Sequence, residues 1–164
     1  MSILDLVHSA RQNHALEHAT VHMLSRANPY ERLIGRSTDS GFFIYGGVST
    51  QEVANAATEA LARLQQGELH LAIHPRCGTN LAVTGILAGL AAFGATLGRT
   101  RSRFERLPLA LSAATVAAIA AQPVAHMVQE RVTTSTDVEG LYVAAVTRQE
   151  RAGYVIHKVT VGRE

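Results

Sequence analysis

The chain is poor in several residue types that mark common protein classes. Its 164 residues include a single cysteine, no tryptophan, and only four each of tyrosine and phenylalanine. One cysteine excludes an intramolecular disulfide framework. The net charge is +2, and the 15 basic residues are spread along the sequence with little aromatic interleaving. This composition argues against a nucleic-acid-binding surface, so we expect no nucleic-acid partner.

Charged residues are also missing from two long segments. None occurs in residues 78–98, and none in residues 107–129. Each segment reaches the roughly 20 residues that an α-helix needs to cross the hydrocarbon core of a bilayer. The alternative is a buried soluble hairpin, because both segments are rich in Ala and Gly rather than Leu. The connection of residues 98–106 is short, so we expect two antiparallel neighbouring helices that span a membrane.

The rest of the chain alternates helical and strand-like patterns. We expect a helix over Ile3–Ala27, ended by Asn28-Pro29, and a second helix over residues 51–66. Strands are expected on either side of a turn at residues 39–41, over Leu69–Ile73, and in a terminal hairpin of Leu141–Thr147 and Tyr154–Val161.

These elements predict an α+β fold, in which a small soluble helix/strand domain carries a transmembrane antiparallel helical hairpin. The expected boundaries are 1–77 for the N-terminal helix and α+β segment, 78–129 for the hairpin, and 130–164 for a β-hairpin that packs on the soluble part.

The first chemically informative segment is His14-Ala15-Leu16-Glu17-His18, inside the N-terminal helix. Residues four apart project from one face of a helix, so His14 and His18 can hold one zinc ion. In the inverted zinc-hydrolase pattern His-x-x-Glu-His, the Glu is the general base, which here is Glu17. His22 continues the row and is a candidate additional ligand. The alternative is a helix whose polar histidines lie at a packing boundary.

The second segment is His74-Pro75-Arg76-Cys77-Gly78-Thr79-Asn80, which runs into the first apolar segment. A two-residue spacer, as between His74 and Cys77, is common where two side chains converge on zinc. Arg76 can bind a carboxylate, a phosphate or lipid headgroups. The alternative is a helix-entry loop that caps the first apolar segment.

Together the two segments supply the ligands of a tetrahedral zinc site: His14, His18, His74 and Cys77. A site closed by all of these is structural, whereas a vacant position that takes water would allow Glu17 to act as base. His126, near the end of the second apolar segment, is a candidate extra ligand or proton relay. Haem binding through the histidine row is a weaker alternative, because histidines at helical spacing do not by themselves identify haem.

Both motifs resemble the paired signatures of the YqhQ-like membrane proteins. That family carries a His-Gly-Ala-Glu-His-Lys-Thr type segment and a later His-Pro-Arg-Cys-Gly-Thr-Ser segment that enters a membrane helix. The matching positions in this chain are His14, Glu17, His18, His74, Arg76 and Cys77, and the departures are Leu16, Ala19 and Asn80. The resemblance covers the two motifs and the first apolar segment. It implies a smaller relative of predicted metal-dependent membrane enzymes without an established substrate.

The leading prediction is an integral membrane protein that binds zinc and hydrolyses a peptide or a lipid-linked ester. The alternative is a non-catalytic scaffold, or an accessory subunit of a membrane complex, with a structural zinc site. We expect a prokaryotic plasma-membrane location, with membrane lipid and either a second copy or a membrane complex as partners.

Two sequence signals disagree about the side of the membrane on which the soluble portion lies. Four arginines in the short connection (Arg99, Arg101, Arg103 and Arg106) place it in the cytoplasm by the positive-inside rule. However, the first 77 residues lack the basic region and apolar core of a signal peptide, and a thiol suits the cytoplasm. We expect the soluble portion to be cytoplasmic.

Overall fold

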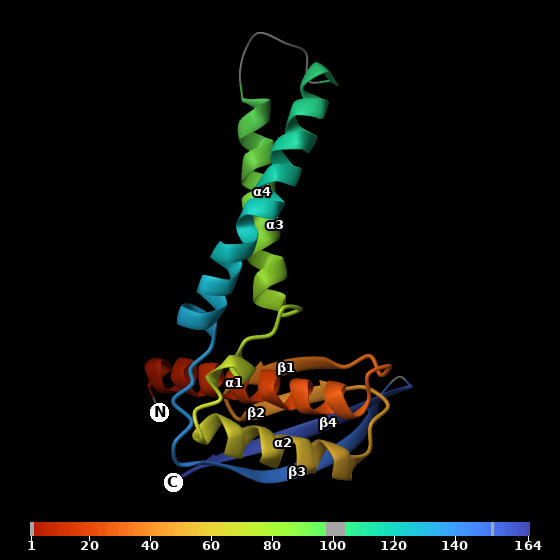
Figure 1. The fold of residues 1–164 in the computed structure, drawn as a ribbon, viewed down its shortest axis with the longest axis vertical. Helices are drawn as coiled ribbons and strands as arrows, with labels where there is room; N and C mark the ends of the chain where they lie inside the picture. Colours follow the sequence, from red (N-terminus) through yellow and green to blue (C-terminus); the bar gives the residue numbers. More distant parts are fainter. Residues whose placement is uncertain (1, 98–103, 152) are drawn as a thin grey trace. The chain divides into compact units, whose positions relative to one another are not determined.

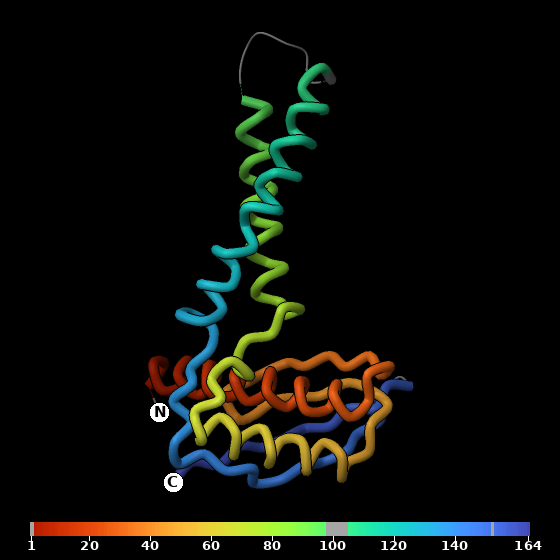
Figure 2. Tube along the Cα trace, in the orientation of Figure 1, coloured from red at the N-terminus to blue at the C-terminus, as the bar shows by residue number. Residues whose placement is uncertain are grey.

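The computed structural model describes residues 2–97, 104–151 and 153–164, and the chain forms two compact units (Figures 1 and 2). The first unit comprises residues 1–74 and 130–164, and the second comprises residues 75–129. The first contains helices and an antiparallel sheet, and the second contains two long helices. The expectation of a mixed α+β chain is therefore confirmed.

The first unit has two helices, α1 (Ile3–Ala27) and α2 (Thr50–Gln65), close to their predicted bounds. Both begin with a capping box, in which a serine hydroxyl accepts from a backbone N–H and an acidic side chain returns the bond. Ser2 and Asp5 form the box of α1, and Ser49 and Glu52 form that of α2. These local signals explain why both helix starts can be predicted from the sequence.

Four strands form one antiparallel sheet in the order β1-β2-β4-β3. Their bounds are β1 (Ile34–Thr38), β2 (Gly41–Tyr45), β3 (Leu141–Arg151) and β4 (Tyr154–Arg163). The turn at residues 39–40 joins β1 to β2 as predicted. The terminal hairpin is longer than predicted, and residue 152 at its tip lies outside the described residues.

Both helices cover the same face of the sheet (Figure 1). The core lies between these two layers. It includes apolar side chains of α1, α2, β2 and β4: Leu16, Leu24, Phe42, Ile44, Val53, Leu64, Val159 and Val161. Because strand residues alternate between faces, β2 and β4 each contribute every second residue to this core.

The segment predicted as a strand over Leu69–Ile73 is instead a 3₁₀ helix, η1 (Leu69–Ala72). Its buried residues are the adjacent Leu71 and Ala72, whereas Leu69 is 47% exposed, so burial does not alternate as it would in a strand. Carbonyls at the end of this segment accept from side chains of α1 rather than from a neighbouring strand. The apolar alternation of the sequence therefore misled the prediction.

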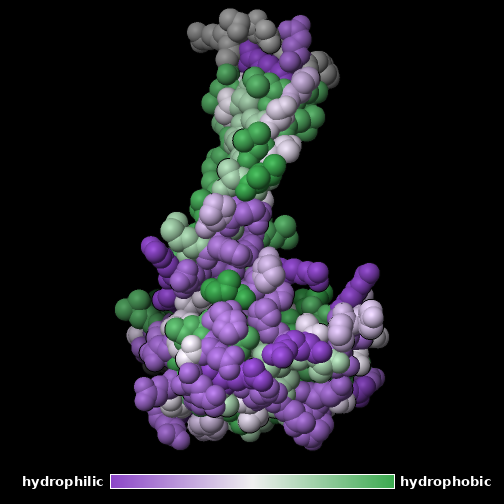
Figure 3. Space-filling model, in the orientation of Figure 1, coloured by the Kyte–Doolittle hydropathy of each residue, from purple (hydrophilic) through white to green (hydrophobic). Residues whose placement is uncertain are grey.

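The second unit is a hairpin of α3 (Gly78–Thr96) and α4 (Leu107–Val128), which pack side by side. A short 3₁₀ turn η2 (Phe104–Arg106) precedes α4, and a π-helical segment η3 (Gln129–Thr133) follows it. Both long helices have the length and apolar composition needed to cross a membrane. Their apolar side chains face outward, as Leu81 and Ile119, 78% and 70% exposed, illustrate (Figure 3). Arg99, Arg101 and Arg103 of the predicted loop lie outside the described residues.

His157 of β4 makes the stability of the first unit depend on pH. Its side chain is buried, with Nε2 3.2 Å from Oγ1 of Thr50, whereas Nδ1 is buried without a hydrogen-bond partner among the described residues. Burial, with a smaller contribution from Arg148, lowers the pKa of His157. The unfolded chain therefore gains a proton near pH 6.5, while the folded chain gains it only at lower pH.

We expect stability to be full above about pH 6.5 and to fall as the pH drops below it, because the unfolded chain binds the proton first. His157→Gln should flatten this fall between about pH 7 and pH 5, measured as the midpoint of thermal unfolding by circular dichroism. His70→Gln, at an exposed position, should retain the wild-type dependence. Equal slopes for wild type and His157→Gln would contradict this account.

Candidate metal centre

Three histidines of α1 form a row on one side of the helix. His14, His18 and His22 are each four residues apart, so they recur about once per turn. The ring centroids of His14 and His18 are 4.3 Å apart, and ligand nitrogens of the two rings lie within 4.8 Å of each other. The helix alone therefore brings two imidazoles within reach of one metal ion.

His74 joins this row from a distant part of the sequence. It directly follows Ile73, the C-cap residue of η1. Its ring centroid lies 5.7 Å from that of His18 and 5.0 Å from that of His22, and the His22 ring meets it edge-on. The first unit thus gathers a continuous row of imidazoles: His14, His18, His74 and His22.

Backbone carbonyls hold the rings of the α1 histidines. Nδ1 of His14 lies 2.8 Å from the carbonyl oxygen of Thr133, and Nδ1 of His18 lies 2.7 Å from that of Ala72. A carbonyl oxygen only accepts, so each Nδ1 carries a proton, and in the neutral ring each Nε2 carries the lone pair. This is the arrangement found in metal-binding histidines, where the second ring nitrogen donates to a carbonyl or carboxylate.

His22 has the opposite tautomer. Its Nε2 lies 3.0 Å from the carbonyl oxygen of Ile73, so Nε2 donates and Nδ1 carries the lone pair. Its edge-on contact with His74 then helps to orient the His74 ring.

The carbonyls of Ala72 and Thr133 can accept these hydrogen bonds because they lie at the ends of short helices. Ala72 is the last residue of η1, and Thr133 is the last residue of η3. The last carbonyls of a helix have no partner within it and must find one elsewhere. The α1 imidazoles supply the missing donors, so the ends of the two short helices fix the orientation of the rings.

Glu17 lies beside this row and against the sheet. Its side chain is only 6% exposed. It packs on Gly35 of β1, where a Cβ would overlap the Glu17 carboxylate. The absence of a side chain at residue 35 therefore creates the space for the carboxylate between α1 and the sheet.

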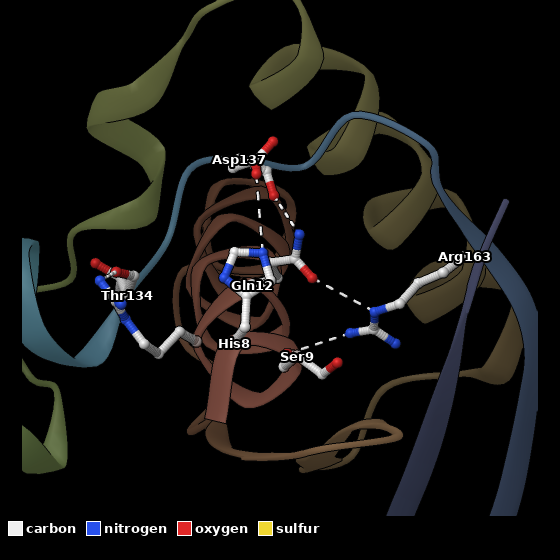
Figure 4. Close-up of polar contacts among 7 residues, drawn as sticks. His8, Ser9, Gln12, Thr134, Asp137 and Arg163 are labelled. Atoms are coloured by element: carbon white, nitrogen blue, oxygen red, sulfur yellow. Dashed lines mark hydrogen bonds and ion pairs between the residues drawn. The ribbon is translucent and has the colours of Figure 1, made fainter. Parts of the chain in front are cut away.

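A polar network fixes the rotation of α1 one residue before the row begins. Asn13 is fully buried, and its amide donates to the carbonyls of Thr38 and Asp39 at 2.8 and 2.9 Å. Arg163 of β4 donates to Oδ1 of Asn13 at 3.1 Å. Figure 4 shows the same guanidinium reaching Gln12 and the backbone of Ser9. Burial lowers the pKa of Arg163, with Asp39 acting in the opposite direction, but a guanidinium stays charged at neutral pH.

The remaining predicted site residues belong to the second unit. Cys77 is the N-cap of α3, and its Sγ accepts from the N–H of Thr79 at 3.4 Å. Arg76 is exposed in the turn before it, and His126 is exposed in the last turn of α4. Within the first unit, the structure brings together His14, His18, His22 and His74, and it places Glu17 on the flank of the same helix.

Two contributors to the site are not part of either sequence motif. The first is the set of carbonyls at Ala72, Ile73 and Thr133, which carry no side-chain signal. The second is Gly35, whose role depends on a contact with Glu17 across 18 residues. A glycine inside a predicted strand can mark close backbone approach, and that signal could have directed attention to it.

Comparison with known proteins places the chain in a family. Residues 9–146, which include both motifs, match the profile of a domain of unknown function, DUF6391, so the chain belongs to that family. An uncharacterized protein of Picosynechococcus sp. (strain ATCC 27264 / PCC 7002 / PR-6) is 40% identical over an alignment of 135 residues, and the alignment covers 76% of this chain. The matched region is 65% of that relative, so the chain spans less than two thirds of its length. No solved structure matches the chain.

These relatives carry no assigned activity. The YqhQ-like resemblance and the metal-dependent chemistry that it implies therefore stay predictions, and the family assignment itself identifies neither a substrate nor a metal.

The contact between Glu17 and Gly35 gives a direct test of the site geometry. We expect Gly35→Ala to lower the free energy of unfolding by about 1–3 kcal/mol, because the new Cβ must displace the buried carboxylate. In the background of Glu17→Ala the same change should cost less, giving a coupling energy of about 0.5–3 kcal/mol in a double-mutant cycle. Chemical denaturation of the full chain in mild detergent measures both values. Additive effects within about 0.5 kcal/mol would mean that the two residues do not interact.

Proposed function

We propose that this protein is a membrane-anchored zinc protein whose imidazole row forms a hydrolytic centre. The observation that carries the proposal is the hydrogen bonding of the row. The rings of His14 and His18 lie 4.3 Å apart between centroids, and each is held through one ring nitrogen by a backbone carbonyl. Such outer partners fix the tautomer and the ring direction that a metal ligand needs.

The types of donor favour zinc among the divalent ions. Imidazole nitrogen suits zinc, copper, iron and nickel, and thiolate sulfur narrows the choice towards zinc. Cys77 follows His74 by three residues, a length of chain that spans at most about 11 Å. Its thiolate is therefore proposed as a ligand beside His14, His18 and His74, while His22 orients His74.

Glu17 is proposed as the general base. When bound at such a centre, zinc acts as a Lewis acid that favours hydrolysis at neutral pH. Glu17 would take the proton of the attacking water, and its position against Gly35 keeps the carboxylate on the flank of the histidine row. A peptide or a lipid-linked ester is the proposed substrate class.

Membrane anchoring is proposed through α3 and α4. Their length, their lack of charge and their outward-facing apolar side chains support insertion, since such a surface is costly in water. The resemblance to the YqhQ-like membrane proteins supports the same assignment. We place the protein in a prokaryotic plasma membrane with the first unit in the cytoplasm, where lipid, a second copy or a membrane complex would be its partners.

A structural zinc site is the second candidate, and burial favours it. His18 is 3% exposed and Glu17 is 6% exposed, so both are shielded from bulk water. A structural site is closed by four protein ligands, whereas a catalytic site keeps one position for water. In this alternative the protein is a scaffold or an accessory subunit.

Elemental analysis tests the shared premise of both candidates. The purified full chain should contain about one zinc ion, because the ligand set suits a single tetrahedral site. His18→Gln should lower the zinc affinity by more than about 100-fold, since the loss of an outer partner alone costs 10–100-fold. His70→Gln, exposed and away from the row, should retain zinc. Wild-type protein without bound transition metal would overturn both candidates.

Glu17→Gln separates the hydrolase from the scaffold. As a general base, Glu17 contributes about 10²–10⁴-fold to a rate, so Glu17→Gln should lower hydrolysis of a chromogenic ester or a labelled peptide by that factor while zinc content stays unchanged. If zinc is lost with the substitution, Glu17 supports the metal rather than the reaction. Absence of hydrolysis by wild type, together with a large fall in thermal stability on chelation, would support the structural site instead.

A further inference from the structure

The sheet has a second face that no helix of the first unit covers. On β4, His157, Val159 and Val161 point to the core beneath α1 and α2 and are buried. The residues between them point to the opposite side and are half-buried. We call this side the open face.

One row across the open face alternates cations with an aromatic ring. Arg36 of β1 pairs with Phe43 of β2, and Phe43 pairs with Lys158 of β4. Paired residues on neighbouring strands point to the same face. Phe43 therefore stands between two cations, and Arg36 is exposed to solvent while Phe43 and Lys158 are half-buried.

The neighbouring row is apolar. Ile34 pairs with Tyr45, and Tyr45 pairs with Ile156. Ile34 is 67% exposed, although it is an aliphatic residue. This row has no role in the core and leaves an apolar strip open beside the cationic row.

Two further tyrosines extend the aromatic character of this face. Tyr142 pairs with Gly162 and lies over it, in the space that a Cβ at residue 162 would fill. Tyr154 is 69% exposed and pairs with Arg151 at the end of the sheet. Three of the four tyrosines of the chain, Tyr45, Tyr142 and Tyr154, therefore lie on the open face.

Charge on this face has one sign. Arg36, Arg151 and Lys158 point to it, and among the described strand residues that share this direction none is Asp or Glu. A cationic face of this kind attracts an anionic partner, and a second copy of the same face would bring like charges together.

We propose that the open face docks on anionic lipid headgroups. Exposed aliphatic and aromatic side chains enter the interfacial region of a bilayer, while Arg and Lys pair with headgroup phosphates. Exposed Ile34 favours lipid over single-stranded nucleic acid, which is bound mainly by stacking on aromatic rings. The proposal relies on the membrane anchoring proposed above only for the nearness of the lipid. It is independent of zinc.

The expected preference follows from the number of cations. Each Arg or Lys near an anionic surface strengthens binding about fivefold, so three of them favour an anionic over a neutral bilayer by about 10²-fold. The preference should weaken as salt is raised, because surface charges are screened within about 10 Å at 0.1 M salt.

The composition of the chain supplies the probes. With no tryptophan present, Tyr30→Phe leaves all tyrosine fluorescence on the open face. Lys158 is the only lysine, so acylation located at this residue by peptide mass spectrometry reports on the cationic row. The full chain is reconstituted into nanodiscs of phosphatidylcholine, or of an equal mixture with phosphatidylglycerol, each with the same fraction of nitroxide-labelled headgroups.

Docking predicts stronger quenching of tyrosine and slower acylation of Lys158 in the anionic discs, both reversed by salt. The double variant Arg36→Gln/Arg151→Gln should lower the preference for anionic lipid about 25-fold. It should therefore also remove most of the difference in quenching and acylation between the two kinds of disc. Arg26→Gln on α1, an exposed position with the same loss of charge, should leave the difference unchanged.

Equal signals in both discs would overturn the proposal. Protection of Lys158 only on addition of single-stranded RNA, or only in discs that hold two copies, would overturn it in favour of those partners. Resistance of the chain to extraction from vesicles by alkaline carbonate tests anchoring separately. If carbonate extracts the chain, anchoring fails, and tyrosine quenching and Lys158 acylation are then measured after vesicles are added to the soluble protein. Failure of anchoring and failure of docking therefore give different results.

Discussion

The structure of the first unit depends on one kind of interaction, in which polar side chains of α1 donate hydrogen bonds to backbone carbonyls of other elements. Buried carbonyls at loops and helix ends must be paired, and an unpaired one costs about 1–3 kcal/mol. In the first unit, side chains of α1 donate hydrogen bonds to eight such carbonyls in other segments. The donors are Arg11, Gln12, Asn13, His14, His18 and His22, and the acceptors lie in β1 and its turn, in η1 and in the segment that follows α4.

The same bonds that hold α1 in place also orient its imidazoles. Asn13 and Arg163 fix the rotation of the helix, and the ends of η1 and η3 fix the rings. The proposed metal binding would therefore depend on the same hydrogen bonds as folding, because a neutral histidine that donates through one ring nitrogen presents the lone pair of the other. The position of Glu17 likewise depends on a distant element, because its carboxylate occupies the space left by the absent side chain of Gly35 in β1.

The net charge of the chain is small, but its cationic residues are unevenly distributed over the surface of the sheet. A value of +2 spread over 164 residues indicates no particular partner. Strand pairing nevertheless brings Arg36 and Lys158, which are 122 residues apart, to either side of Phe43. Period-two alternation sends apolar residues to the core and these residues to the opposite face. Basic and aromatic residues are little interleaved along the sequence, but the sheet places Phe43 between Arg36 and Lys158 on one surface.

The sequence by itself determined α1, α2, the β1–β2 turn, the terminal hairpin and the two apolar helices, because periodicity and capping act between residues a few positions apart. It also determined that His14, His18 and His22 share one side of α1. Only the tertiary structure decided that His74 joins them, that Gly35 accommodates Glu17, and that Leu69–Ala72 is a 3₁₀ helix rather than a strand. These outcomes depend on which distant elements pack together, since long-range contacts are set by the burial of whole faces and by the pairing of their carbonyls.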